Sequence, residues 1–180
     1  WPADDIEANA ILIEYNNDIA TVRHNITSEY FNVNVNGADV EIISEASIEG
    51  LQYYLSGTTT NGSFSLESDM PYEVILNNTE ITSLTNVPLN LSKNVERNII
   101  IANGTTNILS DSEDSDGKAV INSKGATNIS GFGSLTINAN KKHGISSDND
   151  ININGATISI NHSADASKGL KSDSNIMITD

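Results

Sequence analysis

The chain of 180 residues has no cysteine, only three prolines, and an aromatic content of 5%. Without cysteine it can form neither disulfides nor thiolate metal sites. It contains no apolar run of about 20 residues, the length that a membrane-spanning helix requires. Its opening residues, WPADDIEANA, carry no basic segment of the kind that begins a signal peptide, which is also what a trimmed mature chain would show. A flat row of aromatic side chains for stacking on sugar rings is not visible either.

Basic residues are also scarce, with 9 Lys and Arg against 24 Asp and Glu, for a net charge of -15. Such a charge makes nucleic acid and anionic membranes poor partners. The hydrophobic content of 37% is low for a globular protein, although isoleucine is abundant and regularly placed. A β-solenoid accounts for both features, because only alternate residues of each short strand face inward.

Short alternating segments that repeat are abundant. The segment HGISSDNDINI, which begins at His143, returns 25 residues later as KGLKSDSNIMI, which begins at Lys168. Self-similarity at a fixed period predicts a repeat architecture. In the stretch 151–154 (ININ), alternation places isoleucine on one face of a strand and asparagine on the other. One unit cannot bury its own apolar face, so the pattern predicts an all-β solenoid with copies stacked above and below.

Most of the chain follows this pattern. Residues 1–9 are polar and expected to fray, and residues 10–180 are expected to form one solenoid domain. Residues 10–22 predict a hairpin around an Asn-Asn-Asp turn, which could cap the N-terminal end. At roughly 24 residues per coil and ~4.8 Å between strands, we expect about seven coils and a rod about 35 Å long. Residues 176–180 stop inside a strand pattern, so we expect a solenoid truncated at its C-terminal end.

The pattern breaks once, at residues 111–117 (DSEDSDG), which contain no apolar residue and must leave the solenoid wall as a loop. Carboxylates are the hard oxygen ligands that Ca²⁺ prefers, and Gly117 allows a tight return of the chain. The alternative is a solvated, flexible acidic loop. The candidate calcium ligands in this loop are Asp111, Glu113, Asp114 and Asp116.

A second group of carboxylates consists of Asp148, Asp150 and Asp173. Asp148 and Asp173 share a position in successive coils. Carboxylates stacked about 5 Å apart repel each other unless a cation or a lysine lies between them. These residues could therefore hold calcium, with Asp165 completing the site. The alternative is a set of polar corner residues that hydrogen-bond the backbone in Asx turns.

Lys118, His143 and Lys168 recur at intervals of 25 residues and would stack along one edge of regular coils. A basic strip on an acidic protein predicts recognition of carboxylates, for instance those of a uronate chain. The alternative is a set of solvated lysines that keep the solenoid soluble. The other candidate ligand-binding residues in the same half of the chain are Lys141, Lys142 and Lys171.

The segments YYLSGTTTNGSFSLE, VILNNTEITS, the acidic loop, NISGFGSLTINAN, HGISSDNDININGATISIN and KGLKSDSNIMIT occur in this order. From about Ile11 onward the chain thereby resembles the bacterial β-helix carbohydrate-binding domain family. The resemblance implies a single-stranded, right-handed parallel β-helix, related in shape to pectate lyases, with bound calcium. It also implies binding of plant-type polysaccharide, such as polygalacturonate or cellulose, by a protein that is secreted or attached to the bacterial surface. The chain departs from the family pattern at Ser146, where lysine is frequent, and keeps it at Lys171.

Binding is favoured over catalysis. A pectate-lyase-like reaction needs calcium and a basic side chain, commonly arginine, as proton acceptor. Arg23 and Arg97, the only arginines, lie far from the acidic loop in sequence. A hydrolase would need paired carboxylates on neighbouring coils, and no glycosidase motif is recognisable. We therefore expect a calcium-dependent carbohydrate-binding module. A polysaccharide lyase or hydrolase of β-helix type and an adhesin-like surface solenoid remain the alternatives, and the oligomeric state is left open.

Overall fold

The computed structural model describes residues 6–45, 48–163, 165 and 167–180, and in this part the regular structure is entirely β-strand. No helix long and apolar enough to cross a membrane occurs in these ranges. The strands are β1 (Ala10–Asn16), β2 (Ile19–His24), β3 (Phe31–Asn36), β4 (Asp39–Ser44), β5 (Leu51–Thr59), β6 (Ser63–Ser68), β7 (Tyr72–Thr82), β8 (Leu89–Leu91), β9 (Arg97–Ile101), β10 (Thr106–Ser110), β11 (Ala119–Ser123), β12 (Thr127–Gly131), β13 (Ser134–Ala139), β14 (His143–Ser147), β15 (Ile151–Asn154), β16 (Thr157–His162), β17 (Leu170–Ser172) and β18 (Ile176–Thr179).

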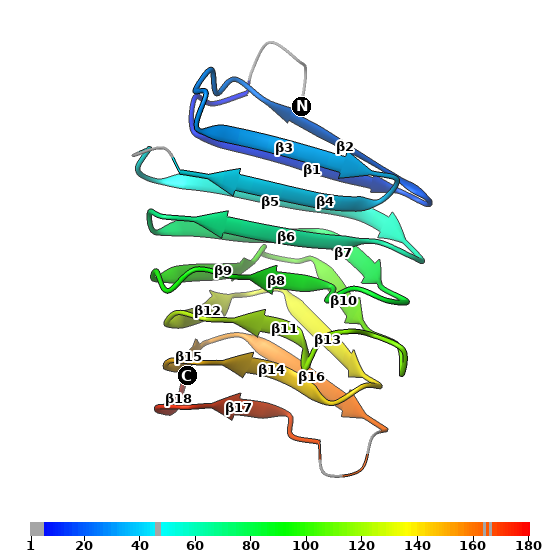
Figure 1. Cartoon of the computed structure of the whole chain (residues 1–180). Helices are drawn as coiled ribbons and strands as arrows, with labels where there is room; N and C mark the ends of the chain where they lie inside the picture. Colours follow the sequence, from blue (N-terminus) through cyan, green and yellow to red (C-terminus); the bar gives the residue numbers. More distant parts are fainter. Residues whose placement is uncertain (1–5, 46–47, 164, 166) are drawn as a thin grey trace.

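Each coil contributes strands to two sheets (Figure 1). The seven-stranded sheet has the order β17-β14-β11-β8-β6-β4-β3, and the remaining strands form an eleven-stranded sheet. Strands of successive coils pair in parallel, as β6 does with β8 and β11 with β14. The prediction of a parallel β-helix is thus confirmed.

The β-helix has about 5 turns, so the prediction of about seven was wrong. The turns can be followed along the inward position of the seven-stranded sheet, occupied in order by Val40, Phe64, Leu89, Ile121, Ile145 and Leu170. Successive differences between these residue numbers are 24, 25, 32, 24 and 25, which is close to the expected period except where the acidic loop is inserted. The chain up to the end of β4 includes two antiparallel hairpins, so fewer residues are left for coils than a regular division of the chain assumes.

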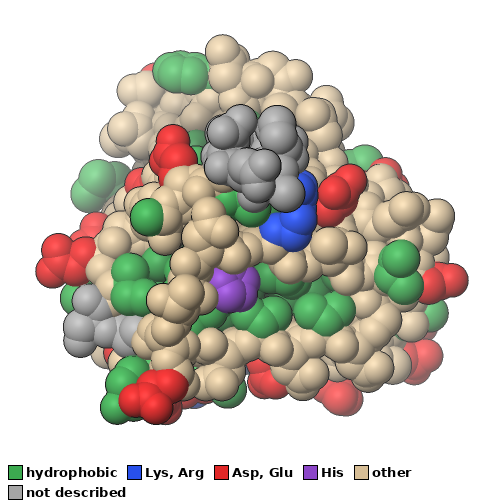
Figure 2. Space-filling view, turned by 90° about the horizontal axis from the view of Figure 1, so that it is seen from above, with side chains coloured by type: hydrophobic (Ala, Val, Ile, Leu, Met, Phe, Trp, Pro, Cys, Tyr) green, Lys and Arg blue, Asp and Glu red, His purple; other side chains and the backbone are tan. Residues whose placement is uncertain are grey.

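Two antiparallel hairpins close the N-terminal end, and the first of them, β1–β2, is the hairpin predicted for residues 10–22. β1 pairs antiparallel with β2 and parallel with β5, while β4 pairs antiparallel with β3 and parallel with β6. Asn17, in the predicted turn between β1 and β2, has a positive φ of 54°. Viewed from this end, acidic side chains are spread around the rim (Figure 2).

Residues 1–5 lie outside the described residues, so the fraying expected of residues 1–9 and the domain boundary at residue 10 stay predictions. Ile6, which lies just before β1, packs against Ala10 and Leu12 of that strand.

The core is one continuous set of apolar side chains between the two sheets. Alternation within each strand produces it, because residues at every second position point inward. In β9, for example, Ile99 and Ile101 are fully buried while Asn98 and Ile100 are partly exposed. Stacking of coils then places Ile99 beside Ile129 and Ile129 beside Ile153.

Candidate functional site

The acidic loop leaves the solenoid wall between β10 and β11, as predicted, but it folds back onto the connection between β7 and β8. The Ser112 hydroxyl donates to the carbonyl of Leu84 (2.5 Å), and the Ser115 hydroxyl donates to that of Asn86 (3.0 Å). The backbone N–H of Asp116 donates to the carbonyl of Thr85 (2.7 Å). These bonds make the loop a supported ridge on the β-helix surface.

Asp111 is the one carboxylate of this loop that is buried, with 2% of its surface exposed. Its Oδ1 accepts the backbone N–H groups of Asn140 (2.6 Å) and Lys141 (3.2 Å). Its Oδ2 is buried without a hydrogen-bond partner. Burial raises the pKa of Asp111, against the opposing effect of those backbone donors. A carboxylate oxygen without a partner is of the hard type that Ca²⁺ takes, although this oxygen is closed to solvent.

The other three candidate ligands of the loop, Glu113, Asp114 and Asp116, have exposed side chains. Within the described ranges, no three Asp, Glu or His side chains gather closely enough to hold a metal ion. Calcium binding at the loop therefore remains a prediction that rests on Asp111.

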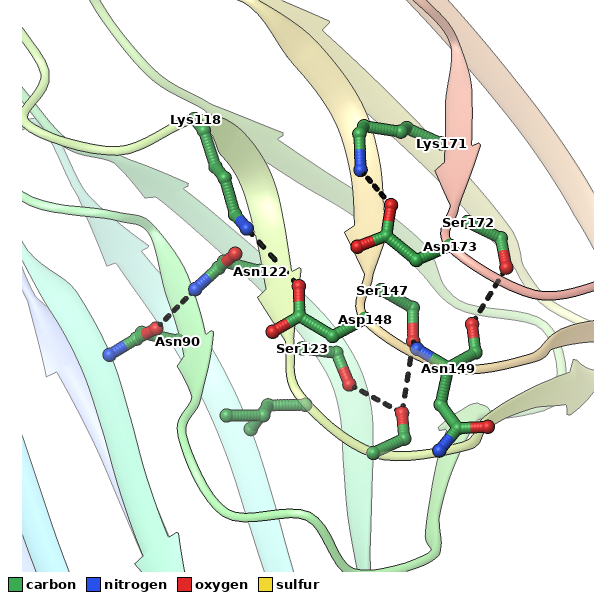
Figure 3. A network of polar contacts seen from close by, with 12 residues as sticks. Asn90, Lys118, Asn122, Ser123, Ser147, Asp148, Asn149, Lys171, Ser172 and Asp173 are labelled. Carbon is green, nitrogen blue, oxygen red and sulfur yellow. Dashed lines mark hydrogen bonds and ion pairs between the residues drawn. The ribbon is translucent and has the colours of Figure 1, made fainter.

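The carboxylates of the second set, Asp148, Asp150 and Asp173, are bonded to lysines and to an asparagine. Asp148 and Asp173 stand in equivalent corners, one residue beyond the paired Ser147 and Ser172. Asp148 forms an ion pair with Lys118 (3.1 Å), and Asp173 forms one with Lys171 (Figure 3). These lysines relieve the repulsion expected between stacked carboxylates.

Asp150 behaves as a corner residue. Its Oδ1 accepts both the backbone N–H (3.0 Å) and the side-chain amide (3.1 Å) of Asn175. Hydrogen bonds from Ser174 and Asn175 lower the pKa of Asp150. Asp165 is exposed in the connection between β16 and β17.

The predicted basic strip is divided by the structure. His143 pairs with Ala119, so Lys118 stands one position before the residue that is in register with His143. His143 is only 5% exposed, and its Nδ1 accepts the backbone N–H of Lys168 (3.1 Å). Burial, and after it repulsion from Lys142 and other lysines, lowers the pKa of His143. A buried imidazole of this kind is neutral near pH 7 and is not part of a basic surface.

Of the other basic candidates, Lys141 donates from Nζ to the carbonyl of Glu113 (2.8 Å) and so contacts the acidic loop. Lys142 and Lys168 are exposed. Among the basic candidates, Lys118, Lys141 and Lys171 each contact a different acidic residue, Asp148, Glu113 and Asp173.

The sequence pattern did not single out the groove on the outer face of the seven-stranded sheet. It has a volume of about 460 Å³ and is lined by β3, β4, β6, β8, the ridge and the connection before β8. Ser65 and Asn90 are in register on its floor, and Asn86, Val87 and Asp116 lie at its wall. The sequence signal for the groove floor was the alternation within the strands, which places polar residues outward. The side wall of the groove could not be predicted in this way, because it depends on how the acidic loop folds.

Comparisons with known proteins agree with this architecture. A curated carbohydrate-binding domain-containing protein of Acetivibrio thermocellus is 29% identical over 141 residues, which are 71% of this chain and 49% of the relative. The chain thus spans about half the length of that protein.

A solved structure described as the polysaccharide lyase-like protein from C. thermocellum, a gadolinium derivative, superposes with a TM-score of 0.64. The match covers 94% of this chain and 96% of that chain, at 17% sequence identity, and therefore shows a shared fold. The model of the carbohydrate-binding domain-containing protein family matches residues 36–180, which is most of the chain. This protein therefore belongs to the family of carbohydrate-binding domain-containing proteins.

Proposed function

We propose that this protein is a calcium-dependent carbohydrate-binding module for extended plant-type polysaccharide, secreted or attached to the bacterial surface. The observation that carries the proposal is the family match over residues 36–180. Polygalacturonate is the acidic candidate ligand and cellulose the neutral one. The rod of stacked coils supports this assignment, because an extended polymer can contact equivalent positions on several coils at once.

The net charge of the protein is the reason for including calcium in the proposal. The protein carries a net charge of -15 and should repel a polyanion, so tight binding of polygalacturonate would require a bridging cation or the lysines. Asp111 would be one ligand through its unpartnered Oδ2, and because this oxygen is enclosed, the loop would have to open around the ion. A bound Ca²⁺ supplies the positive charge that links a uronate carboxylate to an acidic protein surface.

Binding without cleavage is favoured by the positions of the groups that catalysis would need. Asp148 and Asp173 are each paired with a lysine, so they do not resemble the free carboxylate pair of a glycosidase. Arg97 is buried and donates to backbone carbonyls, so it cannot accept a proton from a bound sugar. A polysaccharide lyase is the second candidate, because the structural neighbour is described as polysaccharide lyase-like.

Calorimetric titration with polygalacturonate and with cello-oligosaccharides, each with added Ca²⁺ and with excess chelator, tests the proposal. We expect heat of binding to polygalacturonate that depends on calcium. Asp111→Asn should abolish the calcium dependence, because the amide removes the anionic oxygen. The matched control Asp114→Asn, in an exposed position of the same loop, should bind as the wild type does.

Undiminished polygalacturonate binding in chelator would contradict the calcium-dependent part of the proposal. Absence of heat with every polysaccharide would contradict carbohydrate binding itself. New unsaturated ends after incubation with polygalacturonate would favour the lyase.

A further inference from the structure

A row of polar side chains runs across all strands of the seven-stranded sheet on its outer face. The strand registers align one residue from each strand at this position. In order from the N-terminal cap, the row consists of Asn34, Glu41, Ser65, Asn90, Asn122, Ser146 and Lys171. We call these residues the outer row.

The hydrogen bonds within the outer row are incomplete. Asn122 donates from its amide to Asn90 Oδ1 (2.9 Å), and Asn90 donates to the Ser65 hydroxyl (3.2 Å). The chain of bonds ends there, because Asn122 Oδ1 and the Ser146 hydroxyl have no partner, and both atoms are buried. Asn34 and Glu41 are exposed and Ser65 and Asn90 are partly exposed, so the N-terminal part of the row is the part that is open to a ligand.

A corresponding row on the eleven-stranded sheet is continuous. The amide of Asn152 donates to Asn128 (2.9 Å), that of Asn128 to Asn98 (3.1 Å), and that of Asn98 to Glu73 (3.5 Å). Stacked amides that satisfy one another in this way stabilise the solenoid. The row on the eleven-stranded sheet is thus a structural counterpart that can serve as a control.

The groove of about 460 Å³ lies over the N-terminal half of the outer row. Glu41, Ser65 and Asn90 lie on its floor, and Asn86 and Asp116 lie at one side. That side exists because the acidic loop is hydrogen-bonded to the connection that holds Asn86. The volume is within the range of ligand sites, which is about 300 to 1,000 Å³.

The chemistry of the groove favours an uncharged ligand rich in hydroxyl groups. Asp39, Glu41 and Asp116 line it, and among its described lining residues there is no lysine or arginine. Carboxylates accept hydrogen bonds from hydroxyls, and side-chain amides both donate and accept. A chain of carboxylated sugars would meet like charge there and be repelled.

Farther along the same face, the lysines do not restore a positive surface. Lys118 is paired with Asp148 and Lys171 with Asp173, beside the Asn90–Asn122 hydrogen bond in Figure 3. The net charge of these two pairs is zero, so the outer row passes from an acidic groove to a neutral stretch.

We infer that the groove, with the N-terminal part of the outer row as its floor, forms the binding site for an uncharged stretch of polysaccharide that crosses successive strands of the seven-stranded sheet. The inference rests on the proposed carbohydrate-binding function and assigns it a surface and a ligand charge. Successive positions of the row are about 4.8 Å apart, close to the length of one sugar unit, so consecutive sugars would meet polar side chains on successive strands of the groove floor. This contact requires no calcium.

The test is calorimetric titration with cellohexaose, xylohexaose, mannohexaose and an oligogalacturonate of the same length, all in excess chelator. We expect the wild type to bind at least one of the three uncharged oligosaccharides. Asn90→Ala should weaken that binding roughly tenfold, which corresponds to about 1.4 kcal/mol. Asp116→Ala, at the exposed side of the groove, should weaken it without changing the fold. The control Asn128→Ala, in the row on the eleven-stranded sheet, should leave it unchanged.

The inference is overturned if both groove variants bind uncharged oligosaccharides as the wild type does, or if Asn128→Ala weakens binding equally. Should Asn90→Ala fail to fold, the exposed Asp116→Ala still decides. A wild type that binds only oligogalacturonate, with calcium, would overturn this inference while leaving the proposed function intact. A wild type that binds no carbohydrate at all would overturn both.

Discussion

At the scale of single residues, Arg97 is the clearest example of a polar side chain that the β-helix has enclosed. It is fully buried, and its guanidinium donates to the carbonyls of Leu91 (2.8 Å) and Val95 (2.6 Å), to that of Lys93, and to the Ser123 hydroxyl (2.8 Å). Burial lowers the pKa of Arg97, but an arginine stays protonated at neutral pH. The guanidinium thus supplies hydrogen-bond donors to backbone carbonyls at the end of β8 and in the connection between β8 and β9.

We expect Arg97→Met to lower the free energy of unfolding by about 3 kcal/mol, because it leaves buried carbonyls without donors. Urea denaturation followed by circular dichroism measures this change. Lys124→Met, which replaces an exposed cation by the same side chain, is the control and should change stability by less than about 0.5 kcal/mol. A loss of similar size in both variants would show that the hydrogen bonds of Arg97 are not responsible.

His143 predicts a dependence of stability on pH. Its pKa in the folded protein is lowered by burial and by repulsion from Lys142, Lys171, Lys168 and Lys118, whereas an unfolded histidine titrates near ~6.5. As the pH falls below about 6.5, the unfolded chain takes up the proton first, so the folded state loses stability.

The melting temperature of the wild type should therefore fall more between about pH 7.5 and 5.5 than that of His143→Gln. The exposed His162 provides the control, since His162→Gln should follow the wild-type curve. Parallel curves for wild type and His143→Gln would show that His143 does not control this loss.

At the scale of elements, β5 shows how a single glycine allows a long strand to lie close to its neighbour. β5 runs from Leu51 to Thr59, with a register shift between Leu55 and Gly57 against β7. Gly57 has a φ of +82°, and a Cβ there would lie 2.1 Å from the carbonyl oxygen of Tyr15. The close approach of β5 to Tyr15 in β1 thus requires the absence of a side chain.

Gly57→Ala should lower the free energy of unfolding by about 2 kcal/mol more than Gly104→Ala. Gly104 is a close control, because it has a similar φ of +71° but a Cβ added there would meet no neighbouring atom within 4 Å. The difference between the two variants therefore isolates the clash with the neighbouring coil. Chemical denaturation of both variants measures this difference in the free energy of unfolding. Equal losses would contradict the assigned role of Gly57.

The acidic loop is an element whose existence follows from local sequence but whose place of attachment depends on the stacking of coils. Its existence followed from the lack of apolar residues in 111–117, since a strand in the wall must bury alternate side chains. Its attachment to residues 84–86 joins parts of the chain 28 or 29 residues apart. Such pairing depends on the length of a coil and cannot be derived from the loop itself.

At the scale of the whole molecule, the net charge of -15 and the rod of stacked coils together define two modes of carbohydrate contact. An acidic polysaccharide requires a cation to approach this surface, for which Asp111 is the candidate ligand. An uncharged polysaccharide can lie across the outer row through hydrogen bonds alone. The titrations with calcium and with chelator separate these modes.

Local sequence was sufficient to specify the all-β solenoid, its N-terminal hairpin and the approximate positions of the strands. Alternation of isoleucine with asparagine, as in Ile151–Asn154, carries this information because the inward or outward direction of a side chain is a local property of a strand. The number of turns, the pairing of Asp148 with Lys118 and the burial of His143 became known only from the folded chain. Those features depend on the register between coils, where a shift of one residue moves a side chain to the opposite face.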